Sequence, residues 1–173
     1  CCCCCSLNPI QSNPIHTDLN FEAMKNYVDV VIFDKDNTLT APYDEHIHPL
    51  AQTGLQSAIE IFGQDRVAIL SNSAGTKDDP GYQDAAQIEH ALGIAVIRHD
   101  QKKPGGLHEV MQHFSIHDPA RVCMVGDRLL TDIVFGNLYG MLTVHTLPLC
   151  DGKDNAKDNK VASVIRFGEN KFL

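Results

Sequence analysis

The sequence predicts an α/β fold in which one mainly parallel β-sheet carries helices on both faces. Two observations support this fold class. Short runs rich in Val, Ile, Leu and Ala recur with the length of buried strands, and segments with apolar residues at helical spacing separate them. This alternation is typical of parallel sheets built with right-handed helical crossovers. A chain of 173 residues with 43% hydrophobic content can also supply the core that such a sheet requires.

The helices are predicted from capping residues and from apolar periodicity. Asp18 or Asn20 can cap the first short helix. The next helix places Leu55, Ala58 and Phe62 on one side, and Gly63 is a plausible stop. In chain order, we predict helix 20–26, strand 30–33, helix 50–62, strand 66–73, helix 82–92, strand 94–98, helix 107–114, strand 122–125, helix 129–139 and strand 141–146.

The domain organisation is predicted to be simple. Residues 1–18 lack periodicity and form an irregular lead-in, and residues 19–173 form a single domain. Five of the seven cysteines are Cys1 to Cys5, which cannot serve as a disulfide framework, so we expect the body of the protein to be reduced. The run itself is an artefact of the sequence, a lipidation or metal-binding tract, or an inert tail.

The overall charge excludes some classes of partner. A formal net charge of -8 and a pI of about 5.5 argue against a general nucleic-acid binder, which carries a broad basic surface. No apolar stretch approaches the ~20 residues that span a bilayer, so we do not expect an integral membrane protein. Work on a membrane surface stays open, and the sequence does not define the oligomeric state.

Two acids, Asp34 and Asp36, directly follow the first predicted strand. In an open parallel sheet, ligands bind at the carboxyl ends of the strands, so these acids can hold a divalent metal, an anion bridged by the metal, or both. The alternative is that they only terminate the strand, because Asp and Asn are ordinary turn residues. The remaining strands must decide between these interpretations.

Polar residues follow the other predicted strands at the same edge of the sheet. They are Ser71 and Asn72 after the second strand, Lys102 and Lys103 after the third, and Asp127 and Asp132 after the fourth. Together these residues supply what phosphoryl transfer requires. One carboxylate can attack phosphorus and a second can move protons. Carboxylates suit Mg²⁺, while a lysine and hydroxyl or amide donors offset charge on the transferred group.

These clusters resemble the four ordered motifs of the haloacid dehalogenase superfamily. The residues that carry the resemblance are Asp34-Lys35-Asp36-Asn37-Thr38, Ser71-Asn72, Lys103-Pro104 and Gly126-Asp127-Arg128-Leu129-Leu130-Thr131-Asp132. The resemblance implies a Rossmann-like fold, Mg²⁺ and a phospho-aspartate intermediate. It implies that Asp34 is the nucleophile, that Asp36 is the general acid/base, and that Lys103 neutralises phosphate and nucleophile.

The resemblance also implies binding roles. Ser71, with Asn72 beside it, is expected to bind the substrate's phosphoryl oxygens. The expected metal residues are Asp34, Asp36 through its backbone carbonyl, Asp127, and Asp132 as a supporting acid near the metal or the lysine. Lys102 and Arg128 are candidates for gripping a second phosphate or a headgroup, with loop solvation or helix capping as the alternative. Lys103 rather than Lys102 is chosen as the catalytic lysine because it directly precedes Pro104.

The spacing of the motifs indicates an open site. The intervals between Asp36 and Ser71 and between Ser71 and Lys103 leave no room for a large cap domain. An open site suits a phosphate attached to a lipid, a protein or a polymer, although some capless relatives act on small substrates.

The stretches around the motifs look like those of the eukaryotic mitochondrial phosphatidylglycerophosphatase family, with Lys35 between the two acids and a paired lysine before Pro-Gly as distinctive points. This likeness implies hydrolysis of phosphatidylglycerophosphate to phosphatidylglycerol on the route to cardiolipin, at the matrix face of the inner mitochondrial membrane. The expected partner is thus an anionic phospholipid, and no nucleic acid. The alternatives are a capless phosphatase of a soluble phosphomonoester or phosphoprotein, and a scaffold protein on a decayed phosphatase fold.

Overall fold

The computed structural model describes residues 19–150. The predicted lead-in, residues 1–18, and the last part of the predicted domain, residues 151–173, lie outside the described residues. The strands are β1 (Val30–Phe33), β2 (Val67–Ile69), β3 (Ala95–Val96), β4 (Val122–Gly126) and β5 (Leu142–His145). The helices are α1 (Phe21–Met24), α2 (Pro49–Phe62), η1 (Gln64–Arg66), η2 (Pro80–Tyr82), α3 (Gln83–Leu92), α4 (Leu107–Phe114), η3 (Pro119–Arg121), η4 (Leu129–Ile133) and α5 (Val134–Leu138).

The five strands form one parallel sheet in the order β3-β2-β1-β4-β5, which confirms the predicted fold class. The central strand β1 pairs Val31 with Val67 of β2 and with Cys123 of β4. All four residues of β1 are buried, as expected for a strand that is covered on both faces. This strand order reverses direction at β1, so the chain leaves β1 toward β2 on one side and returns to β4 on the other.

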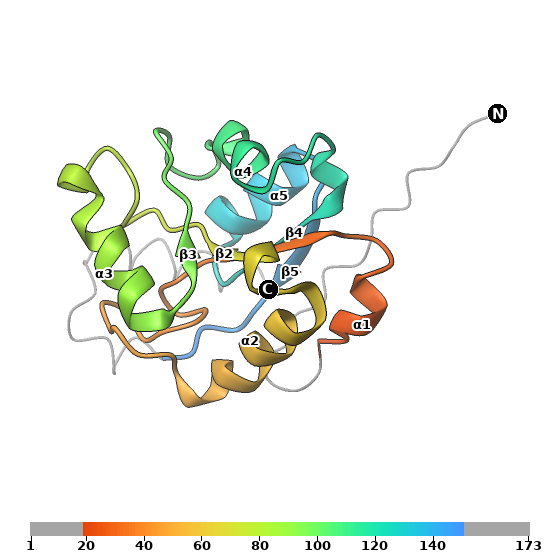
Figure 1. The fold of residues 1–173 in the computed structure, drawn as a ribbon, viewed down its shortest axis with the longest axis horizontal. Coiled ribbons are helices and arrows are strands. Elements are labelled where there is room, and N and C mark those ends of the chain that lie inside the picture. The colour runs from red at the N-terminus through yellow and green to blue at the C-terminus, as the bar shows by residue number, and fades with distance from the viewer. Residues whose placement is uncertain (1–18, 151–173) are drawn as a thin grey trace.

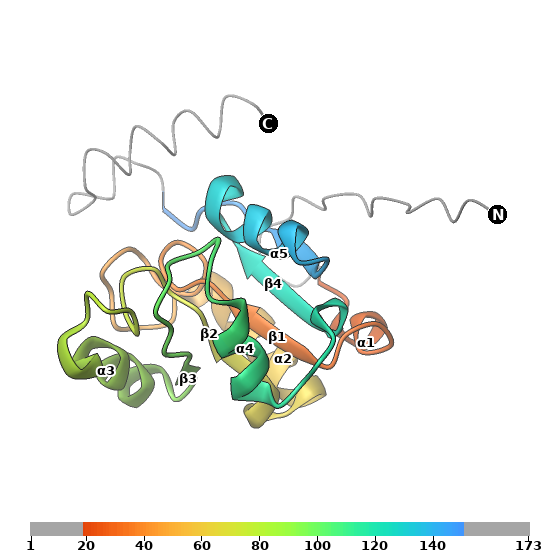
Figure 2. The same cartoon turned by 90° about the horizontal axis from the view of Figure 1, so that it is seen from above.

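Helices cover both faces of the sheet (Figure 1). One core layer joins β-strand residues to the buried sides of α1, α2 and α3, for example Phe21, Leu55 and Ile88. The other layer joins the strands to α4 and α5 through Val110 and Phe135. Figure 2, turned by 90°, shows α4 and α5 over the face of the sheet opposite α2. Burial on both faces explains why the strands are continuous apolar runs.

Local signals account for some of the helix ends. The Asn20 side chain accepts a hydrogen bond from the Ala23 N–H at 3.0 Å, so Asn20 caps α1. Gly63 ends α2 at a φ of 96°, a conformation that favours glycine. Helix α1 is shorter than the predicted 20–26, because the residues after Met24 turn into the approach to β1.

The predicted helix 129–139 is divided in the structure. Its first part, η4, is a π-helical turn in which the Val134 N–H bonds to the Leu129 carbonyl, and α5 follows. Wide turns of this kind are frequent at functional sites. Here the turn carries Asp132, which is fully buried and points back to the end of β4.

No large cap domain interrupts the described part of the chain. The β1–β2 interval contains a loop, α2 and η1, and the β2–β3 interval contains a loop, η2 and α3. Within residues 19–150, no helix combines the length and the apolar character that a bilayer crossing demands.

Candidate active site

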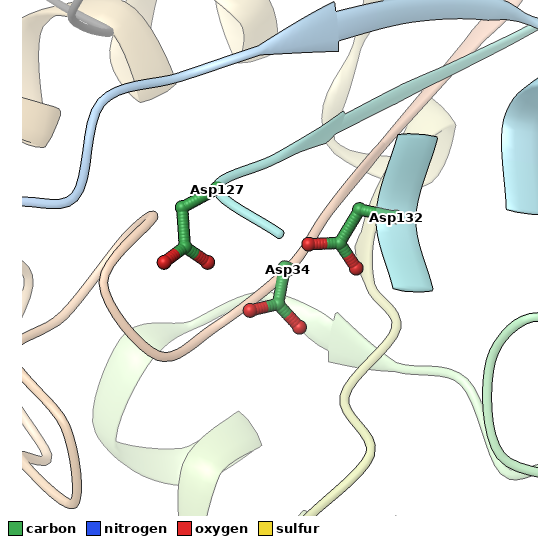
Figure 3. Close-up of side chains that lie close together, drawn as sticks. All are labelled: Asp34, Asp127 and Asp132. Atoms are coloured by element: carbon green, nitrogen blue, oxygen red, sulfur yellow. The ribbon is translucent and has the colours of Figure 1, made fainter. Parts of the chain in front are cut away.

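Three aspartates meet at the carboxyl edge of the sheet, beside the point where the strand order reverses. Asp34 follows β1, Asp127 follows β4, and Asp132 lies in η4. One carboxylate oxygen of each lies within 4.8 Å of the others, and Figure 3 shows the three carboxylates converging. The Asp34 N–H donates to the Val125 carbonyl at 2.8 Å, which extends the pairing of β1 with β4 and holds the two strand ends together.

Lys103 completes this buried cluster. Its ammonium donates to Asp34 Oδ1 at 2.6 Å and lies 2.6 Å from Asp132 Oδ1. The Lys103 side chain is 1% exposed. A lysine is almost never buried to this extent unless it is paired, so the two carboxylates explain its position. Lys103, rather than Lys102, is thus the lysine that contacts Asp34, the predicted nucleophile.

Asp132 is held by contacts to both of its oxygens. Besides Lys103, Oδ1 accepts the Thr131 hydroxyl at 3.3 Å, and Oδ2 accepts the Arg128 N–H at 3.1 Å. A Cβ atom at Gly126 would lie 2.6 Å from Cβ of Asp132, so only glycine leaves room for this side chain at the end of β4. These contacts fit the expected supporting role of Asp132 toward the lysine.

The electrostatics of the cluster favour an additional cation. Burial raises the pKa of Asp34 to about 7; the Lys103 ammonium opposes this shift, and the charges of Asp132 and Asp36 add to it. Burial works against the charge of Lys103, but Asp132 and Asp34 outweigh it and raise the pKa of the ammonium. Three carboxylates facing a single ammonium leave an excess of negative charge when all are ionised.

A hard divalent cation fits these donors. Mg²⁺ prefers a small number of carboxylate oxygens together with water and phosphate. Asp34 and Asp127 present carboxylates to one another at the strand ends, and Asp127 is 4% exposed. Asp36 does not belong to the carboxylate cluster, so a metal contact from Asp36 would have to come from its backbone carbonyl, as the sequence resemblance implies.

The second strand end supports the site through Ser71 and Asn72. Ser71 is buried, and its Oγ accepts the Ser73 N–H at 3.1 Å. The Asn72 amide bonds to the backbone of Lys103, with Oδ1 2.7 Å from the Lys103 N and Nδ2 3.4 Å from its carbonyl oxygen. In this structure the Asn72 side chain therefore positions the lysine, and its contact with substrate stays a prediction.

Asp36 has partners that differ from those of Asp34. Its Oδ1 accepts hydrogen bonds from Lys35 Nζ at 3.1 Å and from the Tyr43 N–H at 3.2 Å, and its Oδ2 accepts the Ser73 hydroxyl at 3.2 Å. The Asp36 side chain is 25% exposed. Ser73 is not among the site residues predicted from the sequence, although it lies only two residues after Ser71 and thus near the same edge of the sheet.

Two predicted binding residues, Lys102 and Arg128, lie at the margin of the site. The Lys102 ammonium lies 2.6 Å from Asp78, and both side chains are exposed. Arg128 is half-buried, and its Nε has no hydrogen-bond partner. Neither side chain joins the Asp34–Lys103–Asp132 cluster, and their contacts with substrate stay predictions.

The two histidines of the loop after β1 have structural positions. His48 caps α2, since its Nδ1 accepts the Leu50 N–H at 3.3 Å. His46 is exposed beside Asp44, with 3.1 Å between its Nδ1 and Asp44 Oδ1.

Comparisons with known proteins identify the family to which this chain is related. The family described as Mitochondrial PGP phosphatase matches residues 5–149. A chloroplastic phosphatidylglycerophosphate phosphatase 1 from Chlamydomonas reinhardtii is 50% identical over 121 residues, which cover 69% of this chain and 44% of that protein. A mitochondrial phosphatidylglycerophosphatase from Saccharomyces cerevisiae is 37% identical over 117 residues, which cover 65% of this chain and 63% of that protein.

The chain therefore spans about half the length of these curated relatives. A crystal structure of an uncharacterized protein from Listeria monocytogenes serotype 4b aligns with a TM-score of 0.50 and 19% identity over 82% of this chain and 99% of that one, which concerns the fold alone. Human chronophin is 48% identical over 63 residues, which cover 36% of this chain and 21% of that protein. With the family match extending over most of its length, this chain belongs to the mitochondrial PGP phosphatase family of the haloacid dehalogenase superfamily.

Proposed function

We propose that this protein is a Mg²⁺-dependent phosphatase that hydrolyses phosphatidylglycerophosphate to phosphatidylglycerol and phosphate, on the route to cardiolipin. The observation that carries the proposal is the buried contact of Lys103 with both Asp34 and Asp132 at the carboxyl edge of the sheet. A carboxylate held by a buried ammonium in an anionic cluster is suited to attack phosphorus. The names of the family and of its curated relatives supply the substrate in this proposal.

In the proposed first step, an Asp34 carboxylate oxygen bonds to phosphorus while the bond from phosphorus to the lipid oxygen breaks. Asp36 donates a proton to that leaving oxygen. In the second step a water oxygen attacks phosphorus, gives its proton to Asp36, and releases phosphate and free Asp34. Lys103 remains beside Asp34 and offsets the charge of the phosphoryl oxygens, with Ser71 as a further donor. Asp34, Asp127 and the Asp36 carbonyl would hold Mg²⁺, which would supply charge neutralisation at the phosphoryl group.

The open edge of the sheet supports a substrate whose phosphate is attached to something large. The described chain places no cap domain over the carboxylates, so a headgroup could approach while its acyl chains stay in a bilayer. In this proposal the protein acts as a peripheral protein at the matrix face of the inner mitochondrial membrane, in line with the mitochondrial names of several relatives. Protease protection and carbonate extraction of isolated mitochondria test that location. Release by carbonate together with protection inside intact inner membranes is the expected result.

The decisive assay is a substrate panel. Purified protein with Mg²⁺ should release phosphate from phosphatidylglycerophosphate in mixed micelles, and Asp34→Asn should abolish the release. Equal or better turnover of soluble phosphomonoesters or phosphopeptides would overturn the lipid assignment and leave a capless phosphatase. If no substrate of the panel releases phosphate and beryllium fluoride does not bind in the presence of Mg²⁺, the results would instead support a scaffold protein.

A further inference from the structure

Lys35 lies between Asp34 and Asp36 in the sequence. It is a second buried lysine, and the proposed mechanism assigns it no role. It is 4% exposed. Its ammonium donates to the Asp44 carbonyl at 2.8 Å, to Asp36 Oδ1 at 3.1 Å and to the Thr40 hydroxyl at 3.1 Å. A lysine has three N–H donors, so these contacts use all of them. Burying an ammonium is costly without such partners, and this arrangement is therefore specific rather than incidental.

The partners of Lys35 belong to two segments that must be aligned with each other. Asp36 lies on the turn after β1, and Asp44 lies in residues 41–48, which we call the flap loop. The flap loop also contacts Asp36 directly, through the Tyr43 N–H. Lys35 therefore fastens the flap loop to the same carboxylate oxygen that Tyr43 holds.

Space for a leaving group lies on this side of the strand end. A cavity of about 300 Å³ is lined by residues that include Lys35, Asp36, Tyr43 and Ser73. The Asp34–Lys103–Asp132 cluster does not line it. The cavity therefore adjoins Asp36 and is separate from the predicted phosphate-binding cluster. Asp36 is the residue placed to move a proton between them.

We infer that Lys35 is a positioning residue for Asp36: it fixes the flap loop and the Asp36 carboxylate in the geometry from which that carboxylate transfers protons to and from the leaving-group oxygen and water. This inference rests on the proposed function. Lys35 does not touch the phosphoryl group in this assignment, so its loss acts through Asp36 alone.

A comparison of two substrates with different leaving groups distinguishes this role from a merely structural one. An alkyl oxygen such as that of phosphatidylglycerophosphate must receive a proton as its bond to phosphorus breaks. The p-nitrophenolate ion departs without a proton. Misplacing Asp36 should therefore slow the first step for the lipid and leave the first step for p-nitrophenyl phosphate nearly unchanged. Hydrolysis of the phospho-aspartate needs Asp36 with both substrates.

The variants are Lys35→Met and the milder Thr40→Val, which removes one contact of the ammonium and keeps its charge. For Lys35→Met we expect kcat for the lipid to fall by about 100-fold, the loss typical of a misplaced catalytic group. In stopped-flow experiments the initial burst of p-nitrophenolate should slow by less than about threefold, followed by a slow steady state. Thr40→Val should change the same quantities in the same direction by a smaller factor.

A double mutant tests whether Lys35 acts through Asp36. Lys35→Met in an Asp36→Asn background should cause no further loss of kcat for the lipid, because the group that it positions is already gone. The matched control is Lys25→Met, which removes a lysine that donates to the Ile61 carbonyl at 2.7 Å on α2, away from the site. This control should retain both rates.

If the wild type is active, either of two outcomes would overturn the inference. One is an equal slowing of the p-nitrophenolate burst and of lipid turnover in Lys35→Met, which indicates general damage to the site. The other is a further fall of kcat for the lipid, by as large a factor as Lys35→Met causes alone, when this change is added to Asp36→Asn. A wild type that releases phosphate from neither substrate overturns the proposed function, and this inference with it. Melting temperatures of all variants identify any that fail to fold, in which case Thr40→Val decides between the outcomes.

Discussion

Asp34 and Asp36 leave the end of the same strand, yet the structure gives them opposite surroundings. Asp34 is 7% exposed and contacts the buried ammonium of Lys103. The Asp36 side chain is 25% exposed and is held by the flap loop, Lys35 and Ser73. Residues two positions apart lie on the same side of an extended strand, so the difference comes from the turn after β1, in which the Thr38 and Leu39 N–H groups bond back to the Lys35 carbonyl.

This contrast shows how the surroundings of two identical carboxyl groups can suit them to different chemical roles. The Asp34 side is buried and charged, and its geometry is set by the ion pairs of Lys103 with Asp34 and with Asp132 of η4. The Asp36 side is half-open and depends on a loop. A change to the first side should alter both stability and phosphoryl chemistry, whereas a change to the second should alter proton transfer with a smaller effect on stability.

The largest expected effect comes from exchanging the two acids for amides. Asp34→Asn should lower kcat by at least about 1,000-fold for every substrate, because no nucleophile remains. Asp36→Asn should still form the phospho-aspartate from p-nitrophenyl phosphate but hydrolyse it slowly, so mass spectrometry after denaturation should locate a phosphoryl group on Asp34. Asp65→Asn, an exposed acid in η1, is the control. Phosphorylation elsewhere on the chain would remove Asp34 from the nucleophile's role.

The two adjacent lysines provide the next comparison. Lys103→Met leaves Asp34 and Asp132 buried without their cation, which we expect to cost about 3–5 kcal/mol of unfolding free energy and most of the activity. Lys102→Met breaks only an exposed pair with Asp78, so its cost should stay below about 1 kcal/mol.

Urea denaturation and kcat/KM for the lipid measure both quantities for the lysine variants. A fall of kcat/KM in Lys102→Met without loss of stability would support contact with the headgroup. An unchanged value would remove Lys102 from recognition. Similar losses of stability in the two variants would contradict the assignment of Lys103 as the buried partner.

Gly126→Ala is expected to disturb the Asp34 side without removing a charged group. The new methyl would press on Asp132, which then withdraws from Lys103; we expect a loss of about 1–3 kcal/mol, as for other overpacked sites. The matched control is Gly136→Ala in α5, whose methyl would press on Thr143. Both variants should lose stability in thermal denaturation, but only Gly126→Ala should also lose kcat by more than about tenfold, since it displaces a side chain of the catalytic cluster. Equal losses of activity would mean that Asp132 does not need its observed position.

The smallest expected effect is the pH dependence of stability. The pKa of folded Asp34, about 7, lies above the ordinary value of 3.8. A raised pKa in the folded state contributes stability below the unfolded pKa that is lost as pH rises through the folded pKa. Without Mg²⁺, the melting temperature should therefore carry a contribution from Asp34 that falls between about pH 4 and pH 7.

Mg²⁺ should oppose this loss, because it binds the ionised carboxylate. We expect the increase in melting temperature on adding Mg²⁺ to be larger at pH 8 than at pH 6. Differential scanning calorimetry at both values measures it. Asp34→Asn should remove most of the pH dependence of this increase. An equal Mg²⁺ effect at pH 6 and pH 8 in the wild type would contradict the pKa assignment.

Much of the fold and the list of candidate residues could be predicted from the sequence. Continuous apolar runs such as that of β1 indicate strands buried on both faces, and helical spacing between them indicates crossovers. Parallel strands then bring the residues that follow them to one edge, which is why the sequence alone groups Asp34, Ser71, Lys103 and Asp127. These inferences depend on local pattern and chain direction alone, which a sequence carries.

The tertiary structure decided how these residues divide the work. Both lysines at 102 and 103 follow β3, but only packing shows that Lys103 is buried between two carboxylates while Lys102 pairs with Asp78 at the surface. Likewise, Asn72 reaches the Lys103 backbone and Ser73 reaches Asp36 through contacts between loops that are far apart in the chain. Burial and ion pairing depend on what surrounds a side chain in three dimensions, and a one-dimensional pattern does not contain that information.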